Sequence, residues 1–133
     1  MFWDDHAKPL TEMECRDLLA SVNVGRLSLT LGALPVIVPV TYRYVGGAVI
    51  LKMRDGPARR AAVNNVVAFE IDGANLEPTL WAVLVIGRAL EMTRPEELAA
   101  AEKLDAASSA GAPPEHYFKL PINVISGYRA TTR

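Results

Sequence analysis

The sequence has few cysteines, no long apolar run and no pattern of a secretory signal. It has one cysteine, Cys15, so an internal disulfide is impossible, and we expect this thiol to be a buried small hydrophobe in a reducing compartment. The longest apolar run, Leu80–Ile86, has seven residues, whereas a membrane helix needs roughly twenty. Residues Met1–Lys8 are aromatic and acidic, which is not the pattern of a secretory signal. The sequence therefore predicts a cytoplasmic protein with no membrane partner.

Charge and reactive side chains are equally sparse. The formal net charge is −1 and the two signs are mixed along the chain, which argues against nucleic acid as a partner. The only histidines, His6 and His116, show no metal-ligand spacing, so no metal site is expected. No Ser-His-Asp set, paired-carboxylate motif or phosphate-binding loop indicates hydrolysis or phosphoryl transfer. At 133 residues and 50% hydrophobic composition, the chain is predicted to fold as one domain, 1–133.

Periodicity predicts a mainly β protein with short helices. Thr11 and Glu14 form a capping box that begins a helix ending near Val22, and two further helices are expected at 58–63 and 95–104. Residues 106–114 are predicted to be a flexible connection. Six strands in a mostly antiparallel order indicate a small barrel; they are expected at Gly25–Thr30, Pro35–Tyr42, Ala48–Arg54, Val66–Asp72, Thr79–Met92 and Ile122–Ala130, with 73–78 as a loop.

The most informative stretch is 35–60, where two strands joined by a Gly-Gly turn lead into a cluster of positive charge. The cluster consists of Lys52, Arg54, Arg59 and Arg60, which fall within nine positions. Between them, Asp55 followed by Gly-Pro is typical of the N-cap of a helix with proline at its first position. A helix start with adjacent arginines can bind a small anion such as a phosphate. The alternative is a solvated loop without a ligand. Pro39, inside an otherwise apolar strand, marks an edge, a bulge or backbone that faces a ligand.

Over about 10–129, the chain resembles the flavin-binding split-barrel proteins related to pyridoxamine 5′-phosphate oxidase. The resemblance implies a split β-barrel that forms a homodimer, with FMN at the subunit interface. It is carried by four segments taken together: Val24–Leu29, Pro39-Val40-x-Tyr42, Ala68–Asp72 and Trp81–Arg88.

The resemblance also assigns residues to the cofactor. Two segments, Ile37–Val40 and Leu51–Met53, would contact the flavin ring. The basic pair Arg59 and Arg60 would hold the FMN phosphate, and the charge cluster indicates the same two residues. A polar side chain that usually reaches the ring is replaced here by Ala82. The implied cofactor-binding residues are Ile37, Val38, Pro39, Val40, Leu51, Lys52, Met53, Arg59, Arg60 and the Ala82 position.

Two departures from the true oxidase bear on the reaction. Val40 stands where the oxidase has a lysine for the substrate phosphate, and Gly127–Ala130 replaces an Arg-x-His. Oxidation of pyridoxamine phosphate would leave a second phosphate without a charged partner, so this activity is not expected.

Three functional hypotheses remain. The first is an FMN-dependent oxidoreductase that passes a hydride or electrons to a small organic acceptor. The second is a reductase that uses a deazaflavin coenzyme, and the third is a flavin-binding or carrier protein without turnover. No catalytic residue is assigned; His116 is read as a surface imidazole or, alternatively, as a proton donor at the mouth of a pocket.

Overall fold

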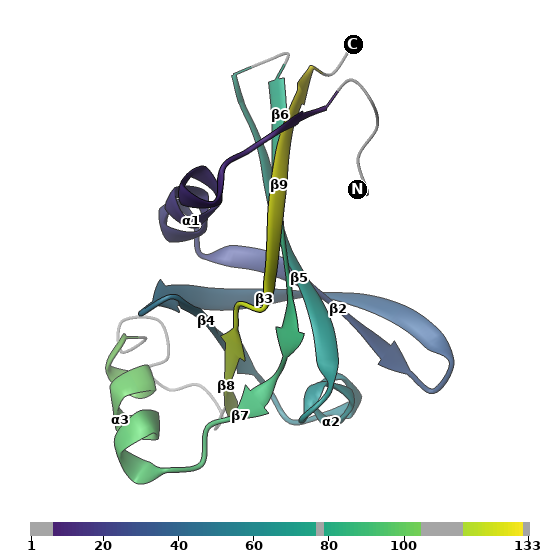
Figure 1. Cartoon of the computed structure of the whole chain (residues 1–133). Helices are drawn as coiled ribbons and strands as arrows, with labels where there is room; N and C mark the ends of the chain where they lie inside the picture. The colour runs from purple at the N-terminus through teal and green to yellow at the C-terminus, as the bar shows by residue number, and fades with distance from the viewer. Residues whose placement is uncertain (1–6, 77–78, 105–115, 132–133) are drawn as a thin grey trace.

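The structure is a computed structural model and describes residues 7–76, 79–104 and 116–131 (Figure 1). Within these ranges the chain forms three helices, which are α1 (Glu12–Ser21), α2 (Pro57–Ala62) and α3 (Pro95–Leu104). The same ranges contain nine strands: β1 (Lys8–Pro9), β2 (Val24–Leu31), β3 (Leu34–Val45), β4 (Ala48–Met53), β5 (Val66–Leu76), β6 (Thr79–Arg88), β7 (Leu90–Glu91), β8 (His116–Pro121) and β9 (Val124–Thr131).

All nine strands belong to one antiparallel sheet with the order β1-β9-β6-β5-β2-β3-β4-β8-β7. The sheet curls into a split barrel, with β2 and β3 crossing the long strands β5, β6 and β9 (Figure 1). The prediction of a mainly β split barrel is confirmed, but the strand number was wrong, since six were expected and nine are present among the described residues.

The interior of the barrel follows from the period of the strands. Leu27 and Leu29 of β2 face inward and are buried, while the residues between them are partly exposed. The largest fully buried side chains come from five different strands and pack as one cluster: Leu27, Tyr42, Leu51, Phe69, Ile71, Phe118 and Leu120, together with Leu19 of α1. Cys15 is 1% exposed and joins this cluster, as expected.

Two elements that were predicted from short local motifs are present at the predicted positions. Thr11 caps α1, and the Thr11–Glu14 capping box has both of its hydrogen bonds, at 2.9 and 3.1 Å. Gly46 and Gly47 join β3 to β4 with φ of 58° and 76°, which is the left-handed backbone that a two-residue hairpin turn requires. These two features fix where α1 begins and how β3 pairs with β4.

Non-local contacts change the later elements. The strand expected at 79–92 is divided into β6 and β7, because the backbone of Ala89 bonds to Asn64 and Asn65 instead of continuing the ladder. Residues 73–76, expected in a loop, extend β5, with a register shift between Gly73 and Leu76. The strand β8 was not predicted, and the expected flexible connection 106–114 lies outside the described residues.

Candidate functional site

The candidate site lies where β3 and β4 part. β4 pairs with β3 only over 41–45, whereas β2 pairs with β3 over 34–41. In the part of the chain that the structure describes, the segment 34–40 therefore has a partner strand on one side only. Pro39 lies in this segment, opposite Arg26. Proline has no N–H to donate, and the open side of β3 has no strand among the described residues that would accept a hydrogen bond from it. The predicted edge position of Pro39 follows from this geometry.

A hollow of about 450 Å³ occupies this gap. Its size falls within the range of small-molecule sites in proteins, roughly 300–1,000 Å³. Most of its walls are apolar, with cationic side chains at one side. The residues that line it are Val38, Pro39, Val40, Thr41, Lys52, Met53, Arg54 and Ala58.

Five of the residues predicted to contact a cofactor line this hollow, namely Val38, Pro39, Val40, Lys52 and Met53. The other three ring-contacting positions do not. Ile37 is adjacent on β3 with 68% of its surface exposed, Leu51 is fully buried in the barrel core, and Ala82 is buried on β6 between Asp72 and Tyr128 of the neighbouring strands. The structure thus brings together the β3 and β4 parts of the predicted set and leaves Ala82 apart from them.

The two arginines of the predicted phosphate site differ in their surroundings. Arg60 is exposed on α2 and forms no side-chain hydrogen bond or ion pair with the residues that the structure describes. Arg59 is instead held by two carboxylates. One of its terminal nitrogens donates to both oxygens of Glu91, at 2.8 and 3.0 Å, and the other lies 3.3 Å from Asp55 Oδ1.

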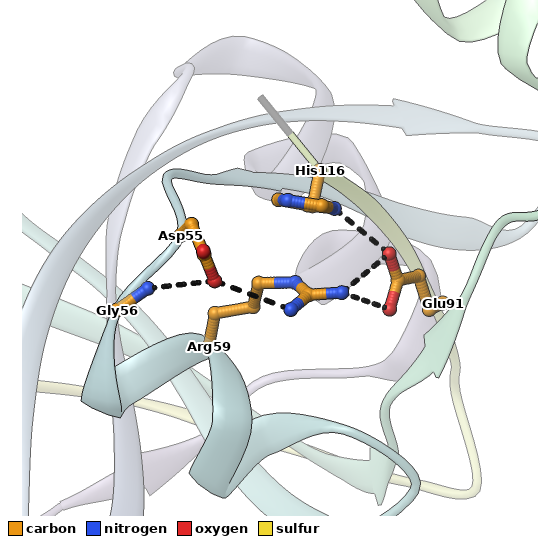
Figure 2. A network of polar contacts seen from close by, with 5 residues as sticks. All are labelled: Asp55, Gly56, Arg59, Glu91 and His116. Atoms are coloured by element: carbon orange, nitrogen blue, oxygen red, sulfur yellow. Dashed lines mark hydrogen bonds and ion pairs between the residues drawn. The ribbon is translucent and has the colours of Figure 1, made fainter. Parts of the chain in front are cut away.

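Glu91 also contacts His116, so three side chains from α2, β7 and β8 meet at one carboxylate (Figure 2). His116 Nδ1 lies 2.9 Å from Glu91 Oε2, and Figure 2 shows the imidazole and the guanidinium approaching the same carboxyl group. The side chains of Arg59 and Glu91 are each 20% exposed. His116 is therefore a partly exposed imidazole that is bonded to Glu91, and of the two readings of this residue the proton donor stays a prediction.

Electrostatics in the network favour the ionised carboxylate. Burial raises the pKa of Glu91, but hydrogen bonds from Arg59 and His116 outweigh it, so its pKa lies below the ordinary value. The pKa of Arg59 is raised, chiefly by its hydrogen bond to Glu91. Arg59 Nε is buried without a hydrogen-bond partner among the described residues, so the contacts with Glu91 and Asp55 carry most of its hydrogen bonding.

The expected helix start is corrected by the structure. Pro57 is at the first helical position as predicted, but the N-cap is Gly56, without a side-chain cap bond. The Asp55 carboxylate accepts from the Gly56 N–H at 3.1 Å and faces Arg59. Because α2 has only six residues and a carboxylate already lies at its start, we assign no anion site to the helix terminus.

Glu91 is the site residue that sequence reasoning missed. It lies 32 positions from Arg59 in a strand of two residues, and no local motif marks it. Among the described residues, no group of three or more His, Cys, Asp and Glu side chains is placed to hold a metal ion. The described helices include none whose length and apolar character would let it cross a membrane.

Comparison with known proteins identifies the family. The family model for pyridoxamine 5′-phosphate oxidase matches residues 11–129, so the chain belongs to this family of split-barrel proteins. The uncharacterized protein Rv0080 of Mycobacterium tuberculosis is 40% identical over 100 residues, which cover 68% of this chain. The matched region spans 64% of the length of that relative.

Solved structures agree on the fold. The FAD binding protein from Mycobacterium smegmatis is 30% identical, with a TM-score of 0.76 over 92% of this chain and 97% of its own. An FAD-binding protein from Mesorhizobium loti has a TM-score of 0.81 at 22% identity, covering 94% of this chain and 99% of that one. The second likeness supports the fold alone, whereas the first also extends to the sequence of a protein that binds FAD.

Proposed function

We propose that this protein is a flavin-binding oxidoreductase that holds its cofactor in the hollow between β3 and β4. The observation that carries the proposal is the position of this hollow. It lies against the unpaired side of β3 and is lined by Val38, Pro39 and Val40, the residues that the resemblance places along a flavin ring. The flavin-binding relative at 30% identity supports the same reading.

The residues present fit such a cofactor. A flavin ring has flat apolar faces and a polar edge, and the hollow offers apolar walls beside strand backbone that has no partner strand on one side. Cationic side chains at Lys52 and Arg54 line the same hollow, and Arg60 follows on α2. When bound, a flavin would supply the transfer of a hydride or electrons to a small organic acceptor. The chain itself would orient the ring and keep water from one of its faces.

FMN is the cofactor that the resemblance implies, and Arg59 with Arg60 is the proposed phosphate-binding pair. FAD is a further candidate because the 30%-identical relative is described as an FAD binding protein. The deazaflavin reductase and the carrier without turnover stay alternatives; the titration below tests the first and the turnover assay tests the second. We propose that the substrate is a small molecule and that pyridoxamine phosphate is not it, because Val40 offers no charge to a substrate phosphate.

We also propose a homodimer, based on one row of the sheet. Registered positions across five neighbouring strands place side chains on the same face, and every member of this row is uncharged. Ile37 and Val124 at its two ends are 68% and 46% exposed, which a second copy would cover. The row consists of Ile37, Ser28, Ala68, Ile86 and Val124.

The test is a titration of the cofactor-stripped protein with FMN, FAD and an oxidised deazaflavin, followed by tryptophan fluorescence. Saturable binding at micromolar concentration identifies the cofactor. The Arg59→Ala/Arg60→Ala double variant should then bind FMN at least tenfold more weakly, because charge-assisted contacts to the phosphate are lost. Failure of all three ligands to bind would refute the proposed function, and unchanged FMN affinity in the double variant would refute the phosphate site alone.

A turnover assay separates the enzyme from the carrier. The protein loaded with the cofactor that binds would be reduced anaerobically, and reoxidation of the flavin would be followed with a panel of small quinone and nitroaromatic acceptors. Reoxidation faster than that of the free reduced flavin supports an oxidoreductase. A rate equal to that of free flavin with every acceptor would favour the carrier.

A further inference from the structure

Arg59 and Arg60 are adjacent on α2 but differ in burial and in their contacts with carboxylates, and this difference indicates different roles. Arg59 contacts two carboxylates and is largely buried, whereas Arg60 is exposed and unbonded within the described part of the chain. Two carboxylates in contact with a cation compensate its positive potential, so the cation attracts a phosphate dianion only weakly. The surroundings of Arg60 impose no such competition.

Counting formal charges shows how strong this difference is. Asp55 and Glu91 contribute two negative charges and Arg59 contributes one positive charge, so the carboxylates that contact Arg59 outnumber it two to one. A phosphate placed against Arg59 would therefore approach two carboxylates of its own sign. It would also have to replace Glu91, leaving that carboxylate beside His116 without its guanidinium.

We propose that Glu91 is a positioning residue of the cofactor site: it holds Arg59, and through it α2, against the end of the barrel, so that Arg60 and not Arg59 meets the cofactor phosphate. This inference rests on the proposed flavin function and divides its phosphate pair into a structural and a binding member. Glu91 would touch neither cofactor nor substrate.

The path from Glu91 to the hollow is short. Glu91 belongs to β7 and His116 to β8, and both strands are part of the barrel sheet. Arg59 follows Ala58 directly on α2, and Ala58 is a wall of the hollow. On the other side, His116 pairs with Met53 across β4 and β8, and Met53 is another wall. A change at Glu91 is thereby transmitted to two walls of the pocket.

The test compares FMN with riboflavin, which has the same ring and no phosphate. Arg60→Ala should weaken FMN binding by roughly 10- to 100-fold, the range of one charged hydrogen-bonded contact, and leave riboflavin unchanged. Arg60→Lys keeps the cation and should restore most of the preference for FMN. Glu91→Gln should weaken both ligands by the same factor, about threefold to tenfold, because it disturbs the wall at Ala58 and not the phosphate contact.

A matched control comes from another ion pair. Glu12→Gln removes a carboxylate that lies 3.0 Å from Arg16 in α1, outside the hollow, and should change neither ligand. Stronger FMN binding in Glu91→Gln, with riboflavin unchanged, would overturn the proposal, because it would show that Glu91 competes with the phosphate for Arg59. Unchanged binding of both ligands in Glu91→Gln would overturn it as well.

Hydrogen exchange without ligand separates this inference from the flavin function. Amides of residues 60–63 should exchange several-fold faster in Glu91→Gln than in the wild type, while those of α1 stay unchanged. Equal exchange rates in α2 would refute the holding role whether or not a flavin binds. Faster exchange in a protein that binds neither FMN nor riboflavin would confirm the contact but overturn Glu91 as a residue of a flavin site.

Discussion

Tyr42 gives a prediction whose magnitude can be worked out from the structure. Its hydroxyl donates to the backbone oxygen of Leu19 at 2.6 Å, and its ring packs edge-on against Phe69 with centroids 4.8 Å apart. The side chain is 2% exposed, and burial raises its pKa to about 12 from the ordinary 10.0. This hydrogen bond joins the last turn of α1 to β3, next to Thr41 in the wall of the hollow.

Tyr42→Phe keeps the ring and removes the hydroxyl. At pH 7 we expect a loss of about 1–3 kcal/mol in the free energy of unfolding, because the Leu19 carbonyl loses its buried donor. The sign of the pH dependence follows from the raised pKa. Above pH 10 the unfolded chain releases the phenolic proton while the folded chain retains it up to about pH 12, so wild-type stability falls over this window.

The size of this alkaline loss can be calculated. At pH 11 the wild type should have lost about 1–2 kcal/mol through Tyr42, and roughly 3 kcal/mol once the pH is well above 12, because each pKa unit of difference between the folded and unfolded chain is worth about 1–2 kcal/mol. The variant lacks this loss, so its deficit relative to the wild type should shrink by about 1–2 kcal/mol between pH 7 and pH 11.

Urea denaturation followed by tryptophan fluorescence at both pH values measures the two differences. Tyr44→Phe is the matched control, since the Tyr44 hydroxyl accepts from Arg16 at 2.9 Å in a half-exposed position. A Tyr42→Phe deficit that is the same at pH 7 and pH 11 would refute the reasoning, because it would mean that the phenol is not held as a buried neutral donor.

Three further predictions concern the hollow, the packing of α1 and the acid limb of stability. Ala58→Trp should place an indole in the wall of the hollow and weaken flavin binding at least tenfold in a fluorescence titration, with unchanged thermal stability; normal affinity would place the cofactor elsewhere. Gly127→Val should lower stability by about 1–3 kcal/mol in urea denaturation, because a Cβ there would lie 2.7 Å from Cys15 Sγ; an unchanged midpoint would contradict this close approach. Because the pKa of Glu91 is lowered by folding, its stabilising effect is present above the ordinary value of 4.5 and is lost as the pH falls through its lower folded value; Glu91→Gln should therefore flatten the acid limb of stability below about pH 4.5, and an equally steep limb in the variant would contradict this assignment.

The elements that the sequence predicted well are those whose cause is local. The capping box of Thr11 and Glu14 and the glycine pair of the hairpin each act within four residues, so their outcome does not depend on distant parts of the chain. β8 has no such signal. Its residues Tyr117 and Phe118 are consecutive and both buried, so the strand lacks the alternation by which a half-buried strand is recognised.

Breaks in the predicted strands have non-local causes as well. The run 79–92 reads as one strand, yet it divides at Ala89 because backbone groups of Asn64 and Asn65 bond there. The positive φ of Asn64, 56°, shows that the chain turns sharply at this point. A pattern of apolar residues cannot reveal which distant segment will take over the hydrogen bonds of a strand.

The candidate site shows the same division between local and non-local information. The β3 and β4 positions of the hollow were named through the family resemblance, and the strands that carry them are joined by a turn that the sequence marks. The ion pair of Arg59 with Glu91 could not be predicted from the sequence, because the two residues are 32 positions apart. Charge clusters in a sequence therefore overestimate the positive charge of a folded site whenever a distant carboxylate joins them.

This correction changes where cofactor affinity should come from. With Arg59 bound to Glu91, the predicted phosphate pair offers one arginine without a carboxylate partner, and the remaining cations at the hollow are Lys52 and Arg54. A site of this kind gains much of its binding free energy from burying the ring against apolar walls, which FMN and riboflavin share. The contact of the phosphate with Arg60 should add the 10- to 100-fold expected for one charged contact. A much larger preference for FMN would mean that a second cation contacts the phosphate, either Lys52 or Arg54 of the hollow or an Arg59 that has left Glu91.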